Sequence, residues 1–452
     1  MKKSVGLFCG LSALLLIFWV SSYKTIAIPP AEPQDPLAIH AMAVVVDTHT
    51  DTLSRVINES TWMPQFDIGV ERGFEVDIPK LRRGGVGVPF FGAWTAPYPP
   101  ASRDVDYSLT NSRLLALMNA LYWTIDQNPN DIGLVKSYQD IDDLKRSGKI
   151  AAVLSIEGAY SLNALNALEL LRQYNDLGVR TIGLTWNFSN DLGEGVSGKY
   201  GDGTRSPAGL TPLGKTIVKE MNRLGIIVDV SHMSEASFWD TIEISDAPVI
   251  ASHSGASTVR YHWRNLTDDQ IRAIAKRKGV VQVPLYGAFL TEGMDRTVSK
   301  AVDHIDYIIK LVGVDYVGIG SDFDGAQPLD DLPTCAFMPS ITNELVARGY
   351  SNSDIYKILG GNSLRVMKAT WRKTASPEMG TPRIVPSLKM GEVVATSQPT
   401  LTAQVDVVQV SPPDSLRLKV ILDGVVHTPE FDAASSVVAL TVDAPLTPKY
   451  HV

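Results

Sequence analysis

Histidine and carboxylate side chains recur in this sequence at the points where short apolar segments end. The sequence contains eight histidines, and three of them follow such segments directly. His49 and Asp51 share one segment end, and they can bind the same metal ion because alternate residues of a strand point to the same side. The side chains at segment ends are His49, Asp51, Glu157, His232, His253 and Asp322. The three imidazoles with Asp51 and Glu157 suit zinc, and one carboxylate can bridge two ions.

Each of these residues also has a plainer interpretation. A single histidine after a strand is usually structural, and Glu157 alone also fits a helix-entry carboxylate near a backbone dipole. The joint occurrence of the whole set favours the metal site. The other histidines do not follow predicted strands, so we expect surface or loop positions for His40, His262, His304, His427 and His451.

The elements that must position this set are short apolar segments that alternate with segments of helical periodicity. One helix is expected to begin at Thr211-Pro212 and to end at Gly225. Near-continuous apolar strands between helices indicate a parallel sheet whose outer face is covered. The predicted strands are Ala43–Val46, Gly85–Phe91, Ile150–Ile156, Arg180–Leu184, Ile226–Val230, Pro248–Ala251, Gly279–Val283 and Tyr316–Ile319.

This order of elements predicts an α/β fold, a closed (β/α)₈ TIM-type barrel. An open doubly wound sheet commonly has a glycine-rich phosphate-binding turn after its first strand. Here the first strand is followed by Asp47-Thr48-His49-Thr50-Asp51 instead. In a closed barrel the carboxyl ends of all strands meet at one mouth, where the histidines and carboxylates would come together.

The ends of the chain have a different composition from the barrel. Residues 1–27 contain Lys2-Lys3 and an apolar run, which predicts a secretory signal peptide or an N-terminal anchor. Residues 28–38 form a Pro-rich linker, 39–374 the barrel domain, and 375–452 a small β-rich C-terminal extension or a partly ordered tail. We therefore expect an exported protein, periplasmic or extracellular. An uncleaved leader would tether it to the membrane.

Composition narrows the classes of partner. The 452 residues are 44% hydrophobic and 20% charged, and the formal net charge is -8. Beyond Lys2-Lys3 the sequence has no basic run, and aromatic residues do not alternate with basic ones, so we expect no nucleic-acid binding. Loss of the leader would remove Cys9 and leave Cys335 without an intramolecular disulfide partner.

Several motifs together resemble the membrane (renal) dipeptidase family of zinc metallopeptidases, which is itself similar to the amidohydrolase barrels. The resemblance extends from about residue 40 to 372. The motifs are "VVDTHTD" (45–51), "LSIEG" (154–158), "GLTPLGKTIVKEMNRLGIIVDVSH" (209–232), "APVIASHSGA" (247–256), "RNLTDD" (264–269), "VGIGSDFDG" (317–325) and "GGNSLRV" (360–366).

The resemblance implies a role for each matching residue. It implies two zinc ions per chain, the first on His49 and Asp51 and the second on His232 and His253, with Glu157 bridging them. It also implies that a metal-bound hydroxide cleaves the peptide bond of dipeptides. Asp322 matches the family's acid/base carboxylate, and Arg264 matches the arginine that binds the substrate's C-terminal carboxylate. The family also includes homodimers.

One position departs from the family pattern. Animal members have a histidine in a Leu-Thr-His context after the fourth strand, and it supports the tetrahedral intermediate. The present sequence has Leu184-Thr185-Trp186-Asn187 there. We expect Trp186 and Asn187 to contact the substrate, either as a pocket wall or with the indole N–H or the amide replacing the missing donor. The departure concerns the substrate range more than the reaction.

Two other functions fit the same residues. A related amidohydrolase would act on acylated amino acids or lactones with the same site. A binding protein would use its metals only to stabilise the fold. A different residue at the position of Asp322 or of a ligand would favour that interpretation, but the sequence has the family's residue at each of these positions.

Overall fold

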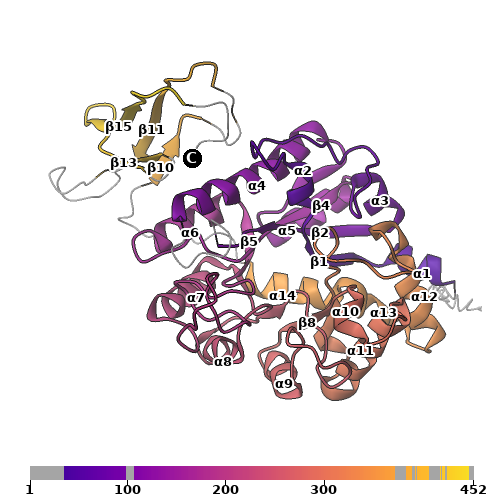
Figure 1. Ribbon diagram of the computed structural model, residues 1–452. Coiled ribbons are helices and arrows are strands. Elements are labelled where there is room, and N and C mark those ends of the chain that lie inside the picture. The colour runs from indigo at the N-terminus through magenta and orange to yellow at the C-terminus, as the bar shows by residue number, and fades with distance from the viewer. Residues whose placement is uncertain are drawn as a thin grey trace, which may run out of the picture.

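The protein is a barrel of parallel strands surrounded by helices, followed by a small separate sheet (Figure 1). The computed structural model describes residues 35–97, 106–371, 383–388, 392, 394–406, 418, 420–422 and 425–446. The predicted leader, residues 1–27, lies outside this part, as do residues 28–34 of the predicted linker.

Eight parallel strands form the barrel, in the order β1-β2-β4-β5-β6-β7-β8-β9. A parallel bridge between Thr50 and Phe323 joins the last strand region to the first. The (β/α)₈ prediction is thus confirmed. The barrel strands are β1 (Val45–Thr50), β2 (Val86–Trp94), β4 (Ile150–Glu157), β5 (Val179–Gly183), β6 (Ile227–Asp229), β7 (Ile250–Ala251), β8 (Val280–Val283) and β9 (Val317–Ile319). A short β3 (Ile132–Leu134) pairs with β4 outside this ring.

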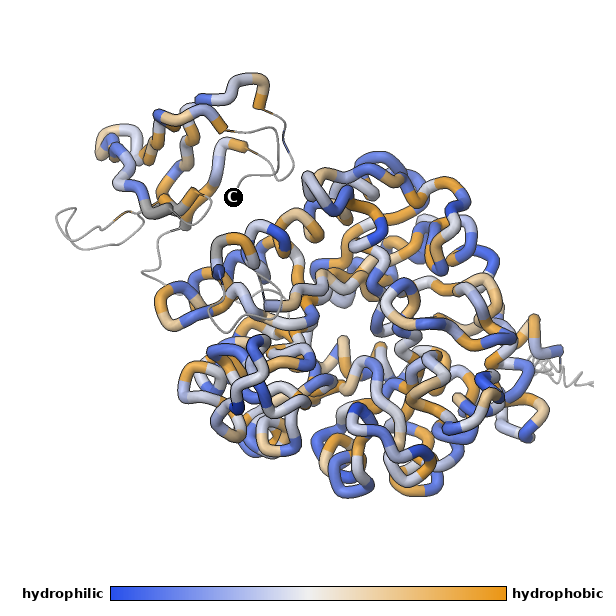
Figure 2. The backbone as a smooth tube through the Cα atoms, in the orientation of Figure 1, coloured by the Kyte–Doolittle hydropathy of each residue, from blue (hydrophilic) through white to orange (hydrophobic). Residues whose placement is uncertain are grey.

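The strands are almost entirely buried because both of their faces are covered. Every residue of β1 and of β4 is buried. Inward side chains fill the barrel, and outward side chains pack against amphipathic helices. This arrangement explains why the strands are near-continuous apolar segments and not alternating ones. Hydrophobic and hydrophilic residues alternate along the surrounding helices (Figure 2).

The helices surround the barrel, and their ends follow from local sequence. Thr211 caps α7 by accepting a hydrogen bond from the Gly214 N–H, Pro212 opens the helix, and Gly225 ends it in a left-handed conformation, as predicted. The helices are α1 (Pro36–Met42), α2 (Thr52–Val56), α3 (Ile78–Arg83), α4 (Tyr107–Gln127), α5 (Tyr138–Arg146), α6 (Ala167–Asp176), α7 (Pro212–Leu224), α8 (Glu235–Ile244), α9 (Asp268–Lys276), α10 (Gly287–Leu290), α11 (Val298–Val312), α12 (Pro339–Ala347), α13 (Asn352–Tyr356) and α14 (Asn362–Thr370), with 3₁₀ turns η1 (Val314–Tyr316) and η2 (Cys335–Phe337).

The "GGNSLRV" motif lies near β1 and β9 and is structural. It spans the end of a π-helical turn, η3 (Lys357–Gly361), and the start of α14. A Cβ at Gly360 would lie 2.0 Å from the Val44 carbonyl oxygen, so only glycine allows this approach. Asn362 Nδ2 donates to the carbonyls of Val314 and Val317, at 2.7 and 2.9 Å.

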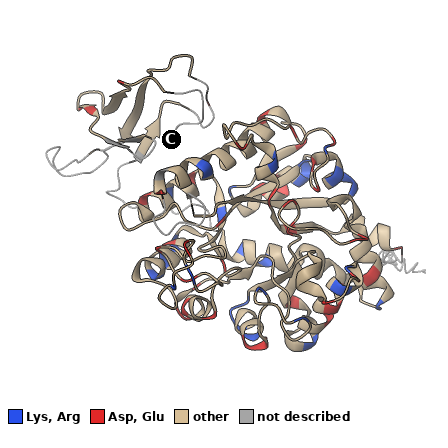
Figure 3. Cartoon of the chain, in the orientation of Figure 1, with Lys and Arg blue, Asp and Glu red and all other residues tan. Residues whose placement is uncertain are grey.

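The C-terminal strands form small antiparallel sheets of their own. Strands β10 (Arg383–Pro386), β11 (Thr400–Asp406), β15 (Val437–Thr441) and β14 (Glu430–Asp432) make one sheet, and β12 (Val420–Leu422) pairs with β13 (Val425–His427). The predicted β-rich extension is therefore present. No helix among the described residues is long and apolar enough to cross a bilayer. Charges of both signs lie interspersed on the outer helices (Figure 3).

Candidate metal centre

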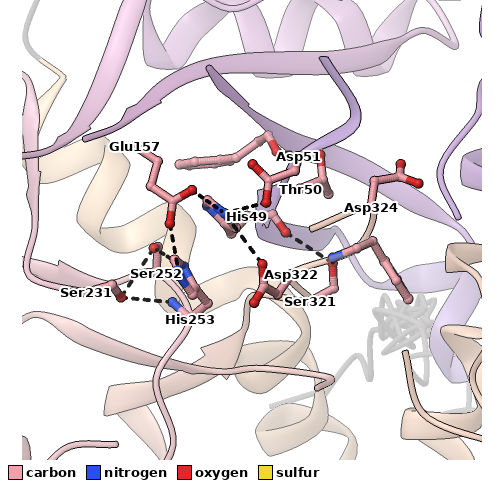
Figure 4. Close-up of polar contacts among 12 residues, drawn as sticks. His49, Thr50, Asp51, Glu157, Ser231, Ser252, His253, Ser321, Asp322 and Asp324 are labelled. Carbon is pink, nitrogen blue, oxygen red and sulfur yellow. Dashed lines mark hydrogen bonds and ion pairs between the residues drawn. The ribbon is translucent and has the colours of Figure 1, made fainter. Parts of the chain in front are cut away.

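The carboxyl end of β1 brings two of the predicted ligands together. His49 Nε2 lies 3.5 Å from Asp51 Oδ2, and both side chains point into the barrel mouth (Figure 4). Neither His49 Nε2 nor Asp51 Oδ1 has a hydrogen-bond partner, although both atoms are buried. Buried polar atoms without partners are costly, and a cation between them would remove this cost.

Glu157, the last residue of β4, lies between two groups of histidines. Its Oε2 is 3.4 Å from His49 Nε2, whereas its Oε1 is 2.8 Å from His232 Nε2 and 3.4 Å from His253 Nε2. Burial acts to raise the pKa of this carboxyl, but the charge of the nearby His49 holds it well below the ordinary value. Each oxygen of an ionised Glu157 can therefore face a different ion.

His232 and His253 follow the adjacent strands β6 and β7, and their Nε2 atoms lie 2.8 Å apart. His232 Nδ1 is 2.9 Å from Asn187 Oδ1, which can only accept, so Nδ1 carries the proton. His253 Nδ1 is 2.8 Å from Ser252 Oγ, whose own proton is donated to Asp229. Both Nε2 atoms therefore present bare lone pairs to one another. Two lone pairs at this distance repel, and a shared cation would relieve the repulsion.

Burial keeps both of these histidines neutral. It lowers the pKa of His232 to about 3 and holds that of His253 well below the ordinary range. Neutral imidazole is the form that binds metal. The donor set thus fits divalent metal ions. Two clusters of possible ligands occur among the described residues, one of His49, Glu157 and His253 and one of His49, Asp51 and Asp322.

Two supporting residues of this centre were not singled out from the sequence. Asp229, at the end of β6, accepts hydrogen bonds from the Ser231 and Ser252 backbone N–H groups at 3.0 and 2.9 Å. It also accepts the Ser252 hydroxyl at 2.5 Å, which orients Ser252 toward His253. Such indirect partners fix the orientation of a metal-binding imidazole. The sequence indicated them only as polar residues beside the predicted histidine ligands, in "VDVSH" and "ASH".

Asp322 lies at the same mouth, on the loop after β9. Its Oδ1 is 3.8 Å from His49 Nε2, and its backbone N–H donates to the His49 carbonyl at 3.0 Å. Burial raises the pKa of the Asp322 carboxyl to about 8; nearby His49 opposes the rise, and Asp51 adds to it. A carboxyl that changes charge near neutral pH suits proton transfer.

The backbone around Asp322 is unusual. Asp322, Asp324 and His232 all have positive φ angles, of 67°, 65° and 65°, which non-glycine residues rarely adopt. Three such residues around one cluster are typical of a functional site. A Cβ at Gly325 would lie 1.9 Å from Asp51 Oδ2, so this glycine lets the loop pass close to the ligand.

Asp324, the second acid of "DFDG", is hydrogen-bonded outside the cluster. Its Oδ2 accepts the Thr52 hydroxyl at 2.7 Å and its Oδ1 accepts the Glu75 N–H at 2.8 Å. In return, the Asp324 N–H donates to Glu75 Oε2 at 2.5 Å. These bonds attach the Asp322 loop to the neighbouring loop and to α2.

Arg264 lies beside the second pair of ligands and is only 4% exposed. Nη2 donates to the His253 carbonyl at 3.3 Å and Nη1 to Ser254 Oγ at 3.4 Å, both long bonds, while buried Nε has no partner. Among the described residues no carboxylate forms an ion pair with it. Burial lowers its pKa to about 10, so it remains charged. A buried, unpaired guanidinium is a binding site for an anion.

Trp186 and Asn187, expected to contact substrate, differ in their surroundings. The Trp186 ring packs edge-on against Trp94 and Phe188, with centroids 5.3 and 5.8 Å apart, and lies 6.0 Å from the His232 ring. It forms an aromatic wall beside the cluster. Asn187 instead lies against His232 through its side-chain oxygen, which suits orientation of the ligand.

The remaining histidines correct one expectation. His40 and His304 were expected at the surface or in loops, but both are buried in helices, 5% and 0% exposed. Each has protein partners at both ring nitrogens. Helical periodicity did not reveal them because a buried histidine satisfied by groups on other elements has no sequence motif of its own. His451 lies outside the described residues.

The fold and the ligand set define a metal-dependent hydrolase on a (β/α)₈ barrel. The chain belongs to one family of that class, the membrane dipeptidases (peptidase family M19), whose model matches residues 34–378. It is accordingly a metallopeptidase of that dipeptidase family.

Several relatives and solved structures are similar over the barrel. An uncharacterised dipeptidase of Schizosaccharomyces pombe is 36% identical over 343 residues, 74% of this chain and 80% of its own. Dipeptidase 3 of Mus musculus is 32% identical over 75% of this chain and 67% of its own. A metallopeptidase from Rhodobacter sphaeroides, solved with a phosphinate mimic of the dipeptide L-Ala-D-Ala, has a TM-score of 0.63 and 27% identity, covering 73% of this chain and 99% of its own.

Proposed function

We propose that this protein hydrolyses the peptide bond of dipeptides at a centre of two zinc ions. His49 and Asp51 would hold one ion, His232 and His253 the other, and Glu157 would bridge them. The observation that carries the proposal is a buried guanidinium without a carboxylate partner, Arg264, directly behind the ligand His253.

Arg264 would set the length of the substrate. Its bidentate fork matches a free carboxylate, and Nη2 donates to the carbonyl of the proposed ligand His253 at 3.3 Å. We propose that this closeness would allow only one residue between the bound carboxylate and the scissile bond. Dipeptides satisfy this spacing, whereas tripeptides place their carboxylate too far away. The ligand of the Rhodobacter sphaeroides relative, a mimic of L-Ala-D-Ala, supports the same substrate class and makes L-Ala-D-Ala a suitable probe.

Asp322 would move the proton. Zinc, when bound, would acidify a water molecule and stabilise the negative charge that develops on the substrate carbonyl. The Asp322 carboxylate, 3.8 Å from the ligand His49, would accept the proton of that water and deliver it to the leaving amine. Its loop is fixed by the Asp324 bonds, which keeps the carboxylate at the mouth.

Trp186 and Asn187 would act differently from each other. We propose that the aromatic wall around Trp186 shapes the pocket for a substrate side chain. Asn187 would hold the His232 imidazole in the tautomer that binds zinc. Export is also a proposal, and it depends on the leader sequence alone.

The test is a substrate panel on zinc-loaded protein, with L-Ala-D-Ala, its C-terminal amide, a tripeptide and an N-acylated amino acid. We expect hydrolysis of the dipeptide and little of the others. Arg264→Ala should raise KM for the dipeptide, because loss of the buried ion pair with the substrate carboxylate should cost about 2–5 kcal/mol of binding free energy. Arg260→Ala is the matched control, because Arg260 lies on the same loop but pairs with exposed Glu292. Preferred hydrolysis of the N-acylated amino acid would assign the related amidohydrolase function instead.

A further inference from the structure

Two buried side chains fasten the loop after β7 to the end of α10. Asn265 is the first. Its Oδ1 accepts the Gly255 N–H at 2.9 Å, and its Nδ2 donates to the Phe289 carbonyl at 2.7 Å and to the Arg260 carbonyl at 2.9 Å. A single amide group thus joins the loop that follows His253 to α10 and to the segment before Arg264.

His304, from α11, repeats this connection one residue further on. Its Nδ1 accepts the Ala256 N–H at 2.9 Å, so Nε2 carries the proton and donates to the Leu290 carbonyl at 3.2 Å. Burial lowers its pKa to about 4, which keeps the imidazole in this neutral form. Asn265 and His304 therefore accept hydrogen bonds from the N–H groups of two consecutive loop residues, Gly255 and Ala256. They also donate hydrogen bonds to two consecutive carbonyls of α10, those of Phe289 and Leu290.

The loop approaches these two side chains as closely as a backbone can. A Cβ at Gly255 would lie 2.8 Å from both Asn265 Oδ1 and His304 Nδ1, so any other residue there would displace them. We refer to Gly255, Asn265 and His304 as the loop clamp.

The loop clamp holds the backbone on either side of Arg264, whose own bonds are weak. The guanidinium makes only two long hydrogen bonds, at 3.3 and 3.4 Å, and lies over the Phe289 ring at 5.5 Å from its centroid. Asn265 is its neighbour in sequence and also holds the Phe289 backbone. The position of the guanidinium is therefore set by the loop and by α10 more than by its own partners.

We propose that Asn265 and His304 are positioning residues for the substrate carboxylate: they hold Arg264 and Phe289 at a fixed place relative to the metal ligand His253. The inference rests on the proposed function of Arg264 as the carboxylate site. Neither residue contacts the ligand cluster through its side chain. Loss of the clamp should weaken binding of the carboxylate and leave the metal ions and the chemical step intact. A displacement of about 1 Å in a group that positions the substrate is enough to lower activity measurably.

The first test uses Asn265→Ala with Asn362→Ala as control. Asn362 is also a buried asparagine whose Nδ2 donates to two carbonyls, but it belongs to the η3–α14 junction. Both variants lose the two bonds donated by Nδ2, and Asn265→Ala also loses the bond accepted by Oδ1, so both should lower the melting temperature. Only Asn265→Ala should raise KM for L-Ala-D-Ala, by about tenfold, with kcat and zinc content near those of the parent. An unchanged KM in folded Asn265→Ala would overturn the proposal.

His304 provides a second pair of variants if Asn265→Ala does not fold. His304→Gln keeps one acceptor and one donor in a planar group and should retain a KM near that of the parent. His304→Leu removes both and should raise KM as Asn265→Ala does. Equal KM values in both variants, or a loss of zinc together with activity, would assign a purely structural role.

The two proposals fail in different ways. If the parent protein with zinc bound does not cleave dipeptides, the proposed function is wrong. If the parent cleaves them and discriminates against the amide, but Asn265→Ala discriminates equally well, only the role of the loop clamp is wrong.

Discussion

Asn187 Oδ1 lies 2.9 Å from Nδ1 of His232, so the residue next to the aromatic wall contacts a proposed metal ligand. This bond fixes the proton on Nδ1 and leaves Nε2 free to face Glu157 Oε1, 2.8 Å away. We therefore expect Asn187 to affect metal binding more directly than substrate binding.

Asn187→Ala should weaken zinc binding at the His232 site. Losing such an indirect partner typically costs about 10–100-fold in metal affinity. Asn187→Asp keeps an acceptor for Nδ1 and should retain most of the affinity. Zinc titration with a competing chelator gives the measurement. If Asn187→Ala binds zinc as tightly as the parent but has a raised KM, Asn187 contacts the substrate instead.

Asp322→Asn should keep zinc and lose most of its activity. The amide has the size of the carboxylate but cannot accept the proton, so kcat should fall by on the order of 10²-fold or more. Asp324→Asn is the companion variant, because Asp324 bonds to Thr52 and Glu75 outside the cluster. It should lower the melting temperature and change kcat much less than Asp322→Asn does. A proportional loss of zinc in Asp322→Asn would make Asp322 a ligand, which one of the two clusters allows.

Trp186 should determine substrate choice. Trp186→Phe keeps an aromatic wall against Trp94 and Phe188, so kcat should stay within about tenfold of the parent. Trp186→His restores the residue of the animal enzymes and should change the ranking among dipeptides. The measurement is kcat/KM on a panel that varies one side chain at a time. A hundredfold drop in kcat for Trp186→Phe with full zinc content would show that the indole N–H is a catalytic donor.

His304 should make the metal-free fold less stable in acid. Its folded pKa of about 4 lies below the ordinary value of 6.5, so the unfolded chain binds the proton first as pH falls. The neutral His304 contributes up to roughly 3 kcal/mol to the free energy of unfolding. This contribution is complete above about pH 6.5 and is lost as pH falls to about 4. His304→Gln removes the titration, so its destabilisation relative to the parent should shrink over this range. Denaturant unfolding of chelated protein at several pH values measures it. A constant difference would show that His304 does not titrate as its burial implies.

The barrel and its mouth were predictable because their signals are local. Each buried strand is a short apolar segment, and each proposed ligand lies at the end of one or shortly after it, as Glu157 ends β4 and His253 follows β7. The loop clamp and the Asp229–Ser252 pair were not predictable in the same way. Their partners lie on other elements, such as the Ala256 N–H that His304 accepts from the loop after β7, and only the closed fold brings them together. Asn187 was singled out as a substrate contact, and only the structure relates its side-chain oxygen to His232.

The central claim, hydrolysis of dipeptides at a two-zinc centre, is tested most directly by measuring zinc content and L-Ala-D-Ala hydrolysis on the same samples during chelation and re-addition of zinc. We expect activity to disappear with the metal and to return with it, reaching a plateau at about two ions per chain. Full turnover by the metal-free protein, or a plateau at a single ion, would contradict the account.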